Sequence, residues 1–428
     1  MKILVVGGGG REHALIWKIR QHSEVEEVFC APGNPGIAAL ADCLPIDPTN
    51  LVELADFAQK MRIDLTVVGP ELPLTMGIVD EFLKRGLRIF GPSSAAAEIE
   101  GSKAFAKEFL ARHNIPSATY QTFTSAREAR SYLKSRDVSY PVVLKVDGLA
   151  AGKGVLVAAD RKAASTFATD VLEGHTHGSA GDRLVIEEFL QGVEASFFAL
   201  SDGKRVVPLV ACQDYKQLGD GDTGPNTGGM GTVSPPAIMD RDMFARTLKE
   251  ILLPTVAGMD AEGRTYRGVL YAGLMITEEG PKVLEFNARF GDPETQAMMP
   301  RLQSDLVGPM LASTEGRLQD VKLDWRREAC ACVVLASDGY PASYEKGHPI
   351  TGLARAAALE NVHVFHSGTR REGEQVLTQG GRVLGVTALG ADLPAALERA
   401  YQAVEIIQFQ GKTFRRDIGY RSGRSSTT

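Results

Sequence analysis

The first hundred residues alternate short apolar runs with amphipathic stretches. Helical patterns start at Glu12 and span residues 51–61, and the apolar runs between them have the length of strands: residues 3–6, 25–30, 65–68 and 89–90. Alternation of strand and helix predicts a parallel, doubly wound sheet. Turn residues follow each of these runs, and ligands of such sheets bind beyond the strand ends.

The pattern changes after about residue 120. Residues 141–146 and 154–158 are apolar runs on either side of a glycine-rich turn, which predicts an antiparallel hairpin. Further strands are expected at residues 185–190, 206–212, 268–277 and 282–287. The last three of them predict a larger mixed sheet.

A third block begins after Trp325. It carries strand patterns at residues 329–336, 362–366 and 382–388, and a helical pattern at 393–406. With 428 residues the chain is long enough for about three domains. We expect an α/β protein whose domains span residues 1–103, 104–325 and 326–428.

Composition and charge exclude several classes of protein. Hydrophobic residues make up 44% and charged residues 23%, as in ordinary globular proteins. A net charge of -6 offers no basic field for nucleic acid or an anionic membrane. No apolar run approaches the length of a membrane span, and the five cysteines are scattered without metal or disulfide spacing. We therefore expect a cytoplasmic protein that binds neither nucleic acid nor membrane.

The first predicted strand ends in four glycines, residues 7–10, followed by Arg11. A strand, a glycine turn and a helix start present backbone N–H groups and a positive helix end to a phosphate. A dinucleotide site would carry an acidic residue about 20 residues further on, where this chain has residues 30–33, Cys-Ala-Pro-Gly. The pattern favours a small phosphorylated ligand over a dinucleotide, and a plain tight turn is the remaining alternative.

A second glycine-rich segment lies in the predicted hairpin. Gly152 and Gly154 flank Lys153 at its tip, and Lys145 lies on the first strand. Glycines let a loop close over phosphates, and lysines offset phosphate charge. This is not a Walker A loop, because Gly154 stands where Ser or Thr is required and the segment connects two strands. The alternative is a solvated hairpin tip.

The strand at residues 185–190 is followed by Glu194. The free backbone groups of a strand edge can pair with adenine, and a carboxylate beyond the strand can accept from ribose hydroxyls. Glu187 and Glu188 on this strand could equally be a solvated pair.

The most specific stretch covers residues 283–294. In a strand of period two, Glu285 and Asn287 share one face while Leu284 and Phe286 share the other. Two oxygen ligands on one face fit a magnesium ion bound to a nucleotide. The alternative is a strand with one wet face, but the many polar residues around the following turn, up to residue 294, argue against it.

A further loop, residues 219–231, holds six glycines and has no periodicity, so it needs unusual backbone angles or mobility. Asp214, Tyr215 and Lys216 precede it. Its acidic residues lack the later ligands and the closing glutamate of a calcium loop.

These segments, in this order, resemble the phosphoribosylamine–glycine ligase family, also called glycinamide ribonucleotide synthetases, within the ATP-grasp superfamily. The similarity spans nearly the whole chain, and residues 289–294, Arg-Phe-Gly-Asp-Pro-Glu, carry its most specific motif. The family often reads Asp-His-Lys-Arg where this chain has Asp214, Tyr215, Lys216 and Gln217. Roles for a histidine at 215 or a cation at 217 therefore do not carry over.

The resemblance implies an ATP-grasp fold with an N-terminal substrate-binding domain of doubly wound parallel sheet, residues 1–103. The ATP-grasp region would span 104–325, with a mobile small lid subdomain at about 120–190, and a C-terminal α+β domain would span 326–428. The implied activity is the ligation of glycine to 5-phosphoribosylamine by a monomer. ATP would be consumed through glycyl phosphate, and the products would be glycinamide ribonucleotide, ADP and phosphate in de novo purine biosynthesis.

The resemblance also implies site residues. Mg²⁺, with Mn²⁺ as the alternative ion, would bind Glu285 and Asn287. Catalytic roles fall to Lys153, Arg289 and Asp292. ATP would be held by Lys145, Gly152, Lys153, Gly154, Glu187, Glu188, Phe189, Leu190 and Glu194. The other substrates would be held by Gly9, Arg11, Gly33, Asn34, Glu71, Asp214, Lys216 and Arg289.

Three alternatives remain. Another ATP-grasp carboxylate–amine ligase, or a carboxylase of the purine pathway, shares the architecture and differs in the carboxylate that it activates. A nicotinamide-dependent oxidoreductase would use the first glycine turn, but would leave Glu285, Asn287 and the Lys153 hairpin without a role. A non-catalytic phosphometabolite sensor would keep the loops and lack turnover.

Overall fold

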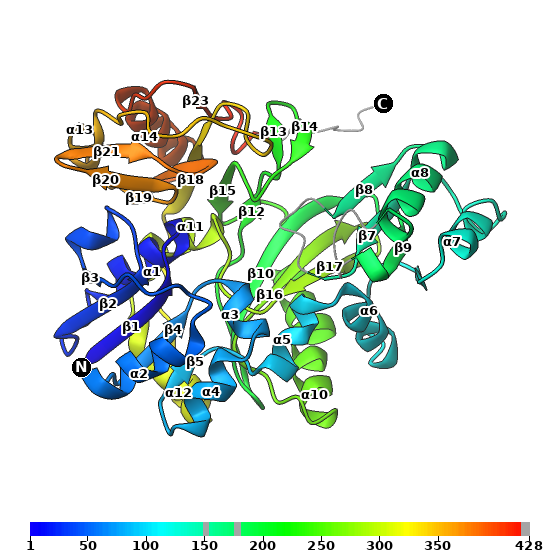
Figure 1. Ribbon diagram of the computed structural model, residues 1–428, viewed down its shortest axis with the longest axis horizontal. Coiled ribbons are helices and arrows are strands. Elements are labelled where there is room, and N and C mark those ends of the chain that lie inside the picture. The colour runs from blue at the N-terminus through cyan, green and yellow to red at the C-terminus, as the bar shows by residue number, and fades with distance from the viewer. Residues whose placement is uncertain (149–153, 175–180, 421–428) are drawn as a thin grey trace.

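The computed structural model describes residues 1–148, 154–174 and 181–420. Four sheets form the body of the molecule (Figure 1): an N-terminal sheet, a central sheet, a C-terminal sheet beside the N-terminal one, and a lid sheet on the far side of the central sheet. In the part of the chain that the structure describes, no helix is both long and apolar enough to cross a membrane.

The N-terminal sheet is parallel, as predicted, with strand order β3-β2-β1-β4-β5. Its strands are β1 (Lys2–Gly7), β2 (Glu27–Pro32), β3 (Asp42–Cys43), β4 (Leu65–Val68) and β5 (Ile89–Phe90). Its helices are α1 (Gly10–Ile19), η1 (Ile37–Ala39), α2 (Leu51–Met61), α3 (Glu71–Thr75) and α4 (Ile78–Lys84). The glycine turns after β1 and β4 therefore lie at the same, carboxyl edge of the sheet.

Two helices, α5 (Ser94–Gly101) and α6 (Lys103–Arg112), lead from this domain to the lid. The lid sheet is antiparallel with order β6-β9-β7-β8. Its elements are β6 (Tyr120–Phe123), α7 (Ala126–Tyr132), β7 (Val142–Val146), β8 (Val155–Ala158), α8 (Arg161–Leu172) and β9 (Leu184–Glu188). The hairpin of β7 and β8 confirms the predicted one, and Lys145 pairs with Val155 near its tip.

The central sheet has order β11-β10-β16-β17. All of its neighbours are antiparallel, so the prediction of a mixed sheet was wrong. Its strands are β10 (Val193–Asp202), β11 (Val206–Pro208), β16 (Arg267–Thr277) and β17 (Gly280–Asn287). Helices α9 (Arg241–Thr247), η3 (Leu248–Leu252), α10 (Leu253–Ala261), α12 (Val307–Glu315) and η4 (Leu318–Asp320) accompany it in the chain.

The C-terminal sheet takes two strands from the middle of the chain. Its order is β12-β15-β18-β22-β19, and β23 also pairs with β18. These strands are β12 (Gln213–Asp214), β15 (Gly231–Ser234), β18 (Ala329–Ser337), β19 (Val362–His366), β22 (Arg382–Gly390) and β23 (Lys412–Thr413). A domain boundary at residue 326, which stays a proposal, would therefore leave two strands of this sheet in the preceding domain.

Three smaller pieces complete the described chain. The loop at 219–231 has the unusual backbone angles that were predicted, with positive φ at Gly221, Asp222, Gly224 and Gly229, and its strand β14 (Thr223–Asn226) forms a ribbon with β13 (Gln217–Gly219). A second ribbon joins β20 (Thr369–Glu372) to β21 (Gln375–Thr378). The remaining helices are α11 (Glu294–Arg301), α13 (Leu353–Ala357) and α14 (Leu393–Ile406).

Candidate active site between the lid, the central sheet and both end domains

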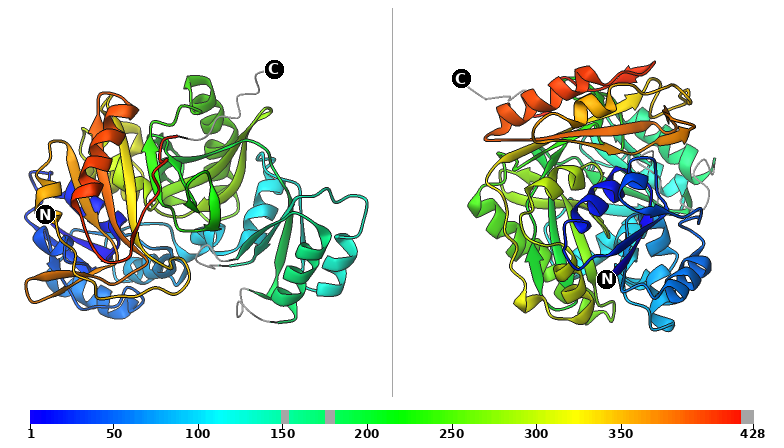
Figure 2. Two further views of the ribbon diagram at one scale, coloured as in Figure 1. Left: turned by 90° about the horizontal axis from the view of Figure 1, so that it is seen from above. Right: turned by 90° about the vertical axis from the view of Figure 1, so that its left-hand side faces the viewer.

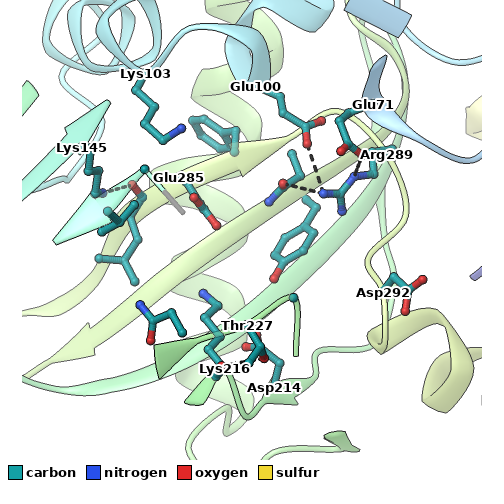
Figure 3. Close-up of a pocket in the computed structure, with 18 of the residues that line it drawn as sticks. Glu71, Glu100, Lys103, Lys145, Asp214, Lys216, Thr227, Glu285, Arg289 and Asp292 are labelled. Atoms are coloured by element: carbon teal, nitrogen blue, oxygen red, sulfur yellow. Dashed lines mark hydrogen bonds and ion pairs between the residues drawn. The ribbon is translucent and has the colours of Figure 1, made fainter. Parts of the chain in front are cut away.

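A cavity of about 680 Å³ lies where the parts of the molecule meet. Its walls include the start of helix α1, the turn after β4, helices α5 and α6, the lid hairpin, the central sheet and the β13–β14 ribbon. Figure 3 shows labelled side chains from several of these elements. Figure 2 shows the lid extending away from the rest of the molecule on one side. Eleven of the residues predicted for the site line this cavity: Arg11, Glu71, Lys145, Gly154, Glu187, Asp214, Lys216, Glu285, Asn287, Arg289 and Asp292.

The predicted metal pair lies on one wall of the cavity, at the end of β17. A bulge interrupts the predicted alternation, because Gly273 pairs with Glu285 and Leu274 already pairs with Val283. Leu284 is therefore an extra residue that lines the cavity, and Val283 joins Phe286 in the hydrophobic core. The bulge interrupts the face that Leu284 and Phe286 were predicted to share, although both residues line the cavity.

Both metal candidates offer oxygen atoms. Burial raises the pKa of Glu285, but Lys216, Lys103, Lys145 and Arg289 outweigh burial and leave the pKa below its usual value. The carboxylate is therefore ionised at neutral pH. The amide oxygen of Asn287 accepts from Nη2 of Arg289 at 3.0 Å, which leaves one lone pair for another partner.

Lysines from two elements meet a buried glutamate on the lid side. The Glu187 carboxylate lies 3.1 Å from Nζ of Lys145 and 2.9 Å from Nζ of Lys107. Burial lowers the pKa of Lys107 to about 8, even though Glu187 favours its charged form. Lys145 also donates to the carbonyl oxygen of the bulge residue Leu284 at 2.9 Å. Glu187 is buried and therefore not a solvated residue, and its role in holding ATP stays a prediction.

Sequence analysis missed Lys107 and its neighbour Lys103, which also lines the cavity. They are four residues apart on α6 and so share one helix face. Two lysines at this spacing on a largely apolar face are the signal that could have found them.

Lys216 projects into the cavity from the base of the β13–β14 ribbon (Figure 3). Its Nζ lies 3.1 Å from Glu194, which is itself not in the cavity wall. Burial lowers the pKa of Lys216, but Asp214, Glu194 and Glu285 more than offset this and hold the pKa well above its usual value. Lys216 is thus a fixed positive charge opposite the predicted metal pair.

Arg289 is enclosed by carboxylates from the N-terminal domain. It lies 3.1 Å from Glu71 and 3.2 Å from Glu100. Burial lowers the pKa of Arg289, and Glu100 and Glu71 together raise it above its usual value. Glu100, which sequence analysis missed, also accepts from the backbone N–H of Ala288 at 2.6 Å. These contacts fix the guanidinium beside Asn287.

Asp292 lies between two arginines at the far end of the cavity. Its Oδ2 accepts from the backbone N–H of Arg11 at 3.4 Å, and its Oδ1 lies 3.5 Å from Nη1 of Arg382. Burial raises the pKa of Asp292, but Arg382 and Arg11 outweigh it and hold the pKa below its usual value. Arg382, on β22 of the C-terminal sheet, is a further cavity residue that sequence analysis missed.

The first glycine turn is filled by a side chain of its own helix. Oε2 of Glu12 accepts from the backbone N–H of Gly9 at 2.6 Å, and Oε1 accepts from Nε of Arg11 at 2.6 Å. Gly7 and Gly69 leave the room that this carboxylate occupies, because a Cβ at either would collide with it. The turn thus already binds an anion, and it is the Glu12 carboxylate.

Several predicted residues lie outside the cavity wall: Gly9, Gly33, Asn34, Glu188, Phe189, Leu190 and Glu194. Asn34 donates to the carbonyl oxygens of Gly8 and His366 at 2.9 and 2.8 Å, so it joins the N-terminal turn to the C-terminal sheet. Glu188 accepts from the backbone N–H of Thr119 at 2.9 Å. Gly152 and Lys153 lie outside the described residues.

Comparisons with known proteins cover the whole chain. Residues 1–100, 101–295 and 330–421 match the models of the N domain, the ATP-grasp (A) domain and the C domain of phosphoribosylglycinamide synthetase. A phosphoribosylamine–glycine ligase of Pseudomonas aeruginosa is 52% identical over 99% of this chain and 98% of its own length. One of Escherichia coli O157:H7 is 51% identical, with 99% of both chains covered.

Solved structures agree with these matches. The crystal structure of phosphoribosylamine–glycine ligase from Thermotoga maritima superposes with a TM-score of 0.84 and 33% identity, covering 98% of this chain and 100% of that one. A biotin carboxylase from Campylobacter jejuni has a TM-score of 0.74 at 15% identity, covering 96% of this chain and 92% of that one. The second similarity shows a common fold.

Proposed function

The chain belongs to the phosphoribosylglycinamide synthetase family, and we propose that it ligates glycine to 5-phosphoribosylamine. ATP would be consumed, and the products would be glycinamide ribonucleotide, ADP and phosphate. The full-length identity of about one half to ligases of this name is the observation that carries the proposal. The cavity supports it, because an oxygen pair and several cations face one another there.

The described residues fit a divalent metal ion. Glu285 is ionised and Asn287 presents an amide oxygen, both on one strand end in the cavity wall. Mg²⁺ and Mn²⁺ both accept such oxygen donors. Glu285 and Asn287 would hold the ion, which would offset the negative charge of the ATP phosphates. We propose Mg²⁺ as the ion used, with Mn²⁺ as a substitute.

The lid side of the cavity suits the nucleotide. Lys145 and Lys107 would neutralise the phosphates, and Gly154 lies beside them in the cavity wall. The end of β9 and the residues after it, Glu188 to Leu190, would pair with adenine through their backbone, and Glu194 would accept from a ribose hydroxyl. Lys153 and Gly152, which lie outside the described residues, remain proposed contacts to the phosphates, and a closing lid remains part of the proposal.

The centre of the cavity suits glycine. Lys216 and Arg289 would orient the glycine carboxylate, whose oxygen attacks the γ-phosphorus and displaces ADP to give glycyl phosphate. The amine of phosphoribosylamine then attacks the acyl carbon, and the C–O bond to phosphate breaks. Asp214 would hold the ammonium group of glycine, and Asp292 would orient the attacking amine.

The far end of the cavity suits the sugar phosphate. Arg11 and Arg382 bring two guanidinium groups to this end from the two terminal domains. One guanidinium group can donate two parallel hydrogen bonds to two oxygens of a phosphate. Because the Gly9 N–H and the Asn34 side chain are used within the protein, we propose that Gly9, Gly33 and Asn34 shape this end without donating to the phosphate. Glu71 would act through Arg289.

The alternatives make different use of the same cavity. An oxidoreductase leaves the metal pair and the lysines without a role, a sensor would bind its ligand without turnover, and another ATP-grasp ligase would activate a different carboxylate. We propose a cytoplasmic monomer that binds no nucleic acid, in keeping with five free cysteines and a net charge of -6.

Measuring whether ADP release needs both glycine and phosphoribosylamine tests the proposed ligase activity. Release that depends on another carboxylate would overturn it.

A further inference from the structure

Arg415 is a buried arginine outside the cavity wall. Its side chain retains 1% of its exposure, and it donates to both carboxylate oxygens of Asp417, at 2.8 and 2.7 Å. Its Nη1 donates to Asp222 at 2.8 Å and to the carbonyl oxygen of Gln217 at 3.2 Å. Burying a guanidinium is unfavourable unless its partners satisfy it. Here the partners come from two segments that are far apart in the chain, so the arginine joins them.

The segment 415–417 also holds the tip of the β13–β14 ribbon through its backbone. The N–H of Arg416 donates to Oδ1 of Asp220, and the N–H of Gly221 donates to Oδ2 of Asp417, both at 2.8 Å. The tip turns through left-handed backbone, with φ of 68° at Gly221 and 54° at Asp222. The ribbon is thereby fastened to the C-terminal segment at its tip.

At the base of the ribbon, Arg415 contacts the residues on both sides of Lys216. Its guanidinium carbon lies 5.0 Å from the ring centroid of Tyr215, which is buried, and the Gln217 carbonyl is the acceptor named above. Tyr215 and Gln217 are also the two positions at which this chain departs from the family pattern. Successive side chains of an extended chain point in opposite directions. Lys216 therefore faces the cavity while Tyr215 packs in the C-terminal core.

The backbone of Lys216 is held from the cavity side as well. Its carbonyl oxygen accepts from the N–H and the hydroxyl of Thr227, at 2.7 and 2.8 Å. The carbonyl of Lys216 is thus fixed by Thr227, which follows β14, and the neighbours of Lys216 are fixed by Arg415. The position of the Lys216 ammonium in the cavity depends on both.

We infer that Arg415 is a positioning residue that holds Lys216 in the cavity, because its hydrogen bonds join the β13–β14 ribbon to the C-terminal segment 415–417. The inference rests on the proposed function, because it takes Lys216 as a cation that orients the glycine carboxylate. Arg415 itself touches no substrate. Its loss should therefore weaken the use of glycine more than the binding of ATP.

A double-mutant cycle tests this inference. We expect Arg415→Lys, which keeps the charge and loses the planar fork, to lower kcat/KM for glycine about tenfold. The KM for ATP should change less than kcat/KM for glycine, because Glu194 pairs with Lys216 whereas most of the other proposed ATP contacts belong to the lid. In the Lys216→Gln background, the same Arg415→Lys change should lower kcat/KM for glycine by less than about twofold, because the residue that it positions is gone.

Arg301→Lys is the matched control. Arg301 is also buried and donates to Ser234 and to backbone carbonyls, but it does not line the cavity or contact the ribbon. This variant should lose thermal stability and keep kcat/KM for glycine. If Arg415→Lys yields no folded protein, Asp222→Asn is the substitute, because it removes the charge of a more exposed partner of Arg415. Its loss of kcat/KM for glycine should likewise be smaller in the Lys216→Gln background.

Equal losses in the two backgrounds, or a wild-type kcat/KM for glycine in Arg415→Lys, would overturn the inference while the wild-type enzyme still makes glycinamide ribonucleotide. A wild-type enzyme that forms no such product would instead overturn the proposed function. The two failures are therefore distinguishable.

Discussion

At the scale of single residues, the ionised Glu285 governs the proposed chemistry. Four cations act on its carboxylate: Lys216, Lys103, Lys145 and Arg289. These cations attract ATP phosphates, and a metal ion shared between the phosphates and the carboxylate would offset their mutual repulsion. Replacing the carboxylate by an amide of the same shape removes the negative charge that would hold the metal ion and keeps the packing.

We expect Glu285→Gln to lower kcat about a hundredfold or more, because the metal ion supplies several kcal/mol of charge stabilisation. The Tm should move little, since the side chain keeps its volume. Turnover at saturating Mg²⁺ and thermal unfolding measure the two effects. Glu279→Gln is the control, because Glu279 is exposed in the turn of the same hairpin and pairs only with Lys282 among the ion pairs of the described residues. Full Mg²⁺-dependent activity of Glu285→Gln would remove the assignment.

The limits of sequence analysis are also visible at this scale. The period of β17 was enough to predict that Glu285 and Asn287 share a face, and the cavity contains both. The glycine turn was predicted as an anion site, yet nothing in its pattern said that Glu12 would fill it. A carboxylate three residues beyond the N-cap position is a capping-box signal. That signal, together with the glycines, could have predicted that the Glu12 carboxylate fills the turn.

At the scale of elements, the hardest strands to predict were those whose residues do not alternate between buried and exposed positions. Leu65–Val68 and Leu51–Met61 have the predicted bounds, because turns or caps delimit a clear period. Strand β10 was missed because most of it is buried on both faces and therefore lacks alternation. The bulge at Leu284 and the pairing of β15 with β18 depend on partners distant in the chain, which no local pattern reports.

Strand β22 contributes one side chain, Arg382, to the cavity, and its role can be tested by a single substitution. It delivers Arg382, which donates to the carbonyl oxygen of Asp292 at 2.7 Å, to the end of the cavity proposed for the sugar phosphate. We expect Arg382→Met to raise the KM for phosphoribosylamine about tenfold or more, since a charged hydrogen bond contributes roughly 1.5–3 kcal/mol. The KM for ATP should stay within about twofold of the wild type.

Steady-state kinetics with each substrate varied in turn provide this comparison. Arg370→Met is the matched control, because Arg370 lies on β20 of the same domain, half-exposed, and pairs with Glu372. A larger effect of Arg382→Met on ATP than on phosphoribosylamine would place the sugar phosphate elsewhere.

At the scale of the whole molecule, the two end domains meet through buried histidines. The backbone N–H of His366 on β19 donates to Nδ1 of His13 on α1 at 2.8 Å, and Trp17 packs on His363 with ring centroids 4.5 Å apart. Burial lowers the pKa of His13 to about 3, helped by His366, and burial lowers the pKa of His363 and of His366 to about 4. The interface is therefore built from neutral rings.

This interface predicts acid sensitivity. The pKa of each folded-state histidine lies below the ordinary value of 6.5, so the unfolded chain binds protons first as the pH falls. Stability should be fully present above pH 6.5 and should be lost progressively toward pH 4. We expect His13→Gln, whose amide oxygen can accept the same N–H, to flatten this decline in Tm. The Tm of the wild type and of His13→Gln is measured from pH 8 to pH 4, each relative to its own value at pH 8. An equal decrease of Tm in the two proteins would contradict the account.

The central claim is that ATP activates the carboxylate of glycine as an acyl phosphate. The most direct measurement follows the oxygen atoms. With glycine labelled with ¹⁸O in its carboxylate, one labelled oxygen should appear in inorganic phosphate for each glycinamide ribonucleotide formed, beside ADP, because the C–O bond of glycyl phosphate breaks in the second step. Unlabelled phosphate beside ADP, or AMP with pyrophosphate as the nucleotide products, would contradict this account.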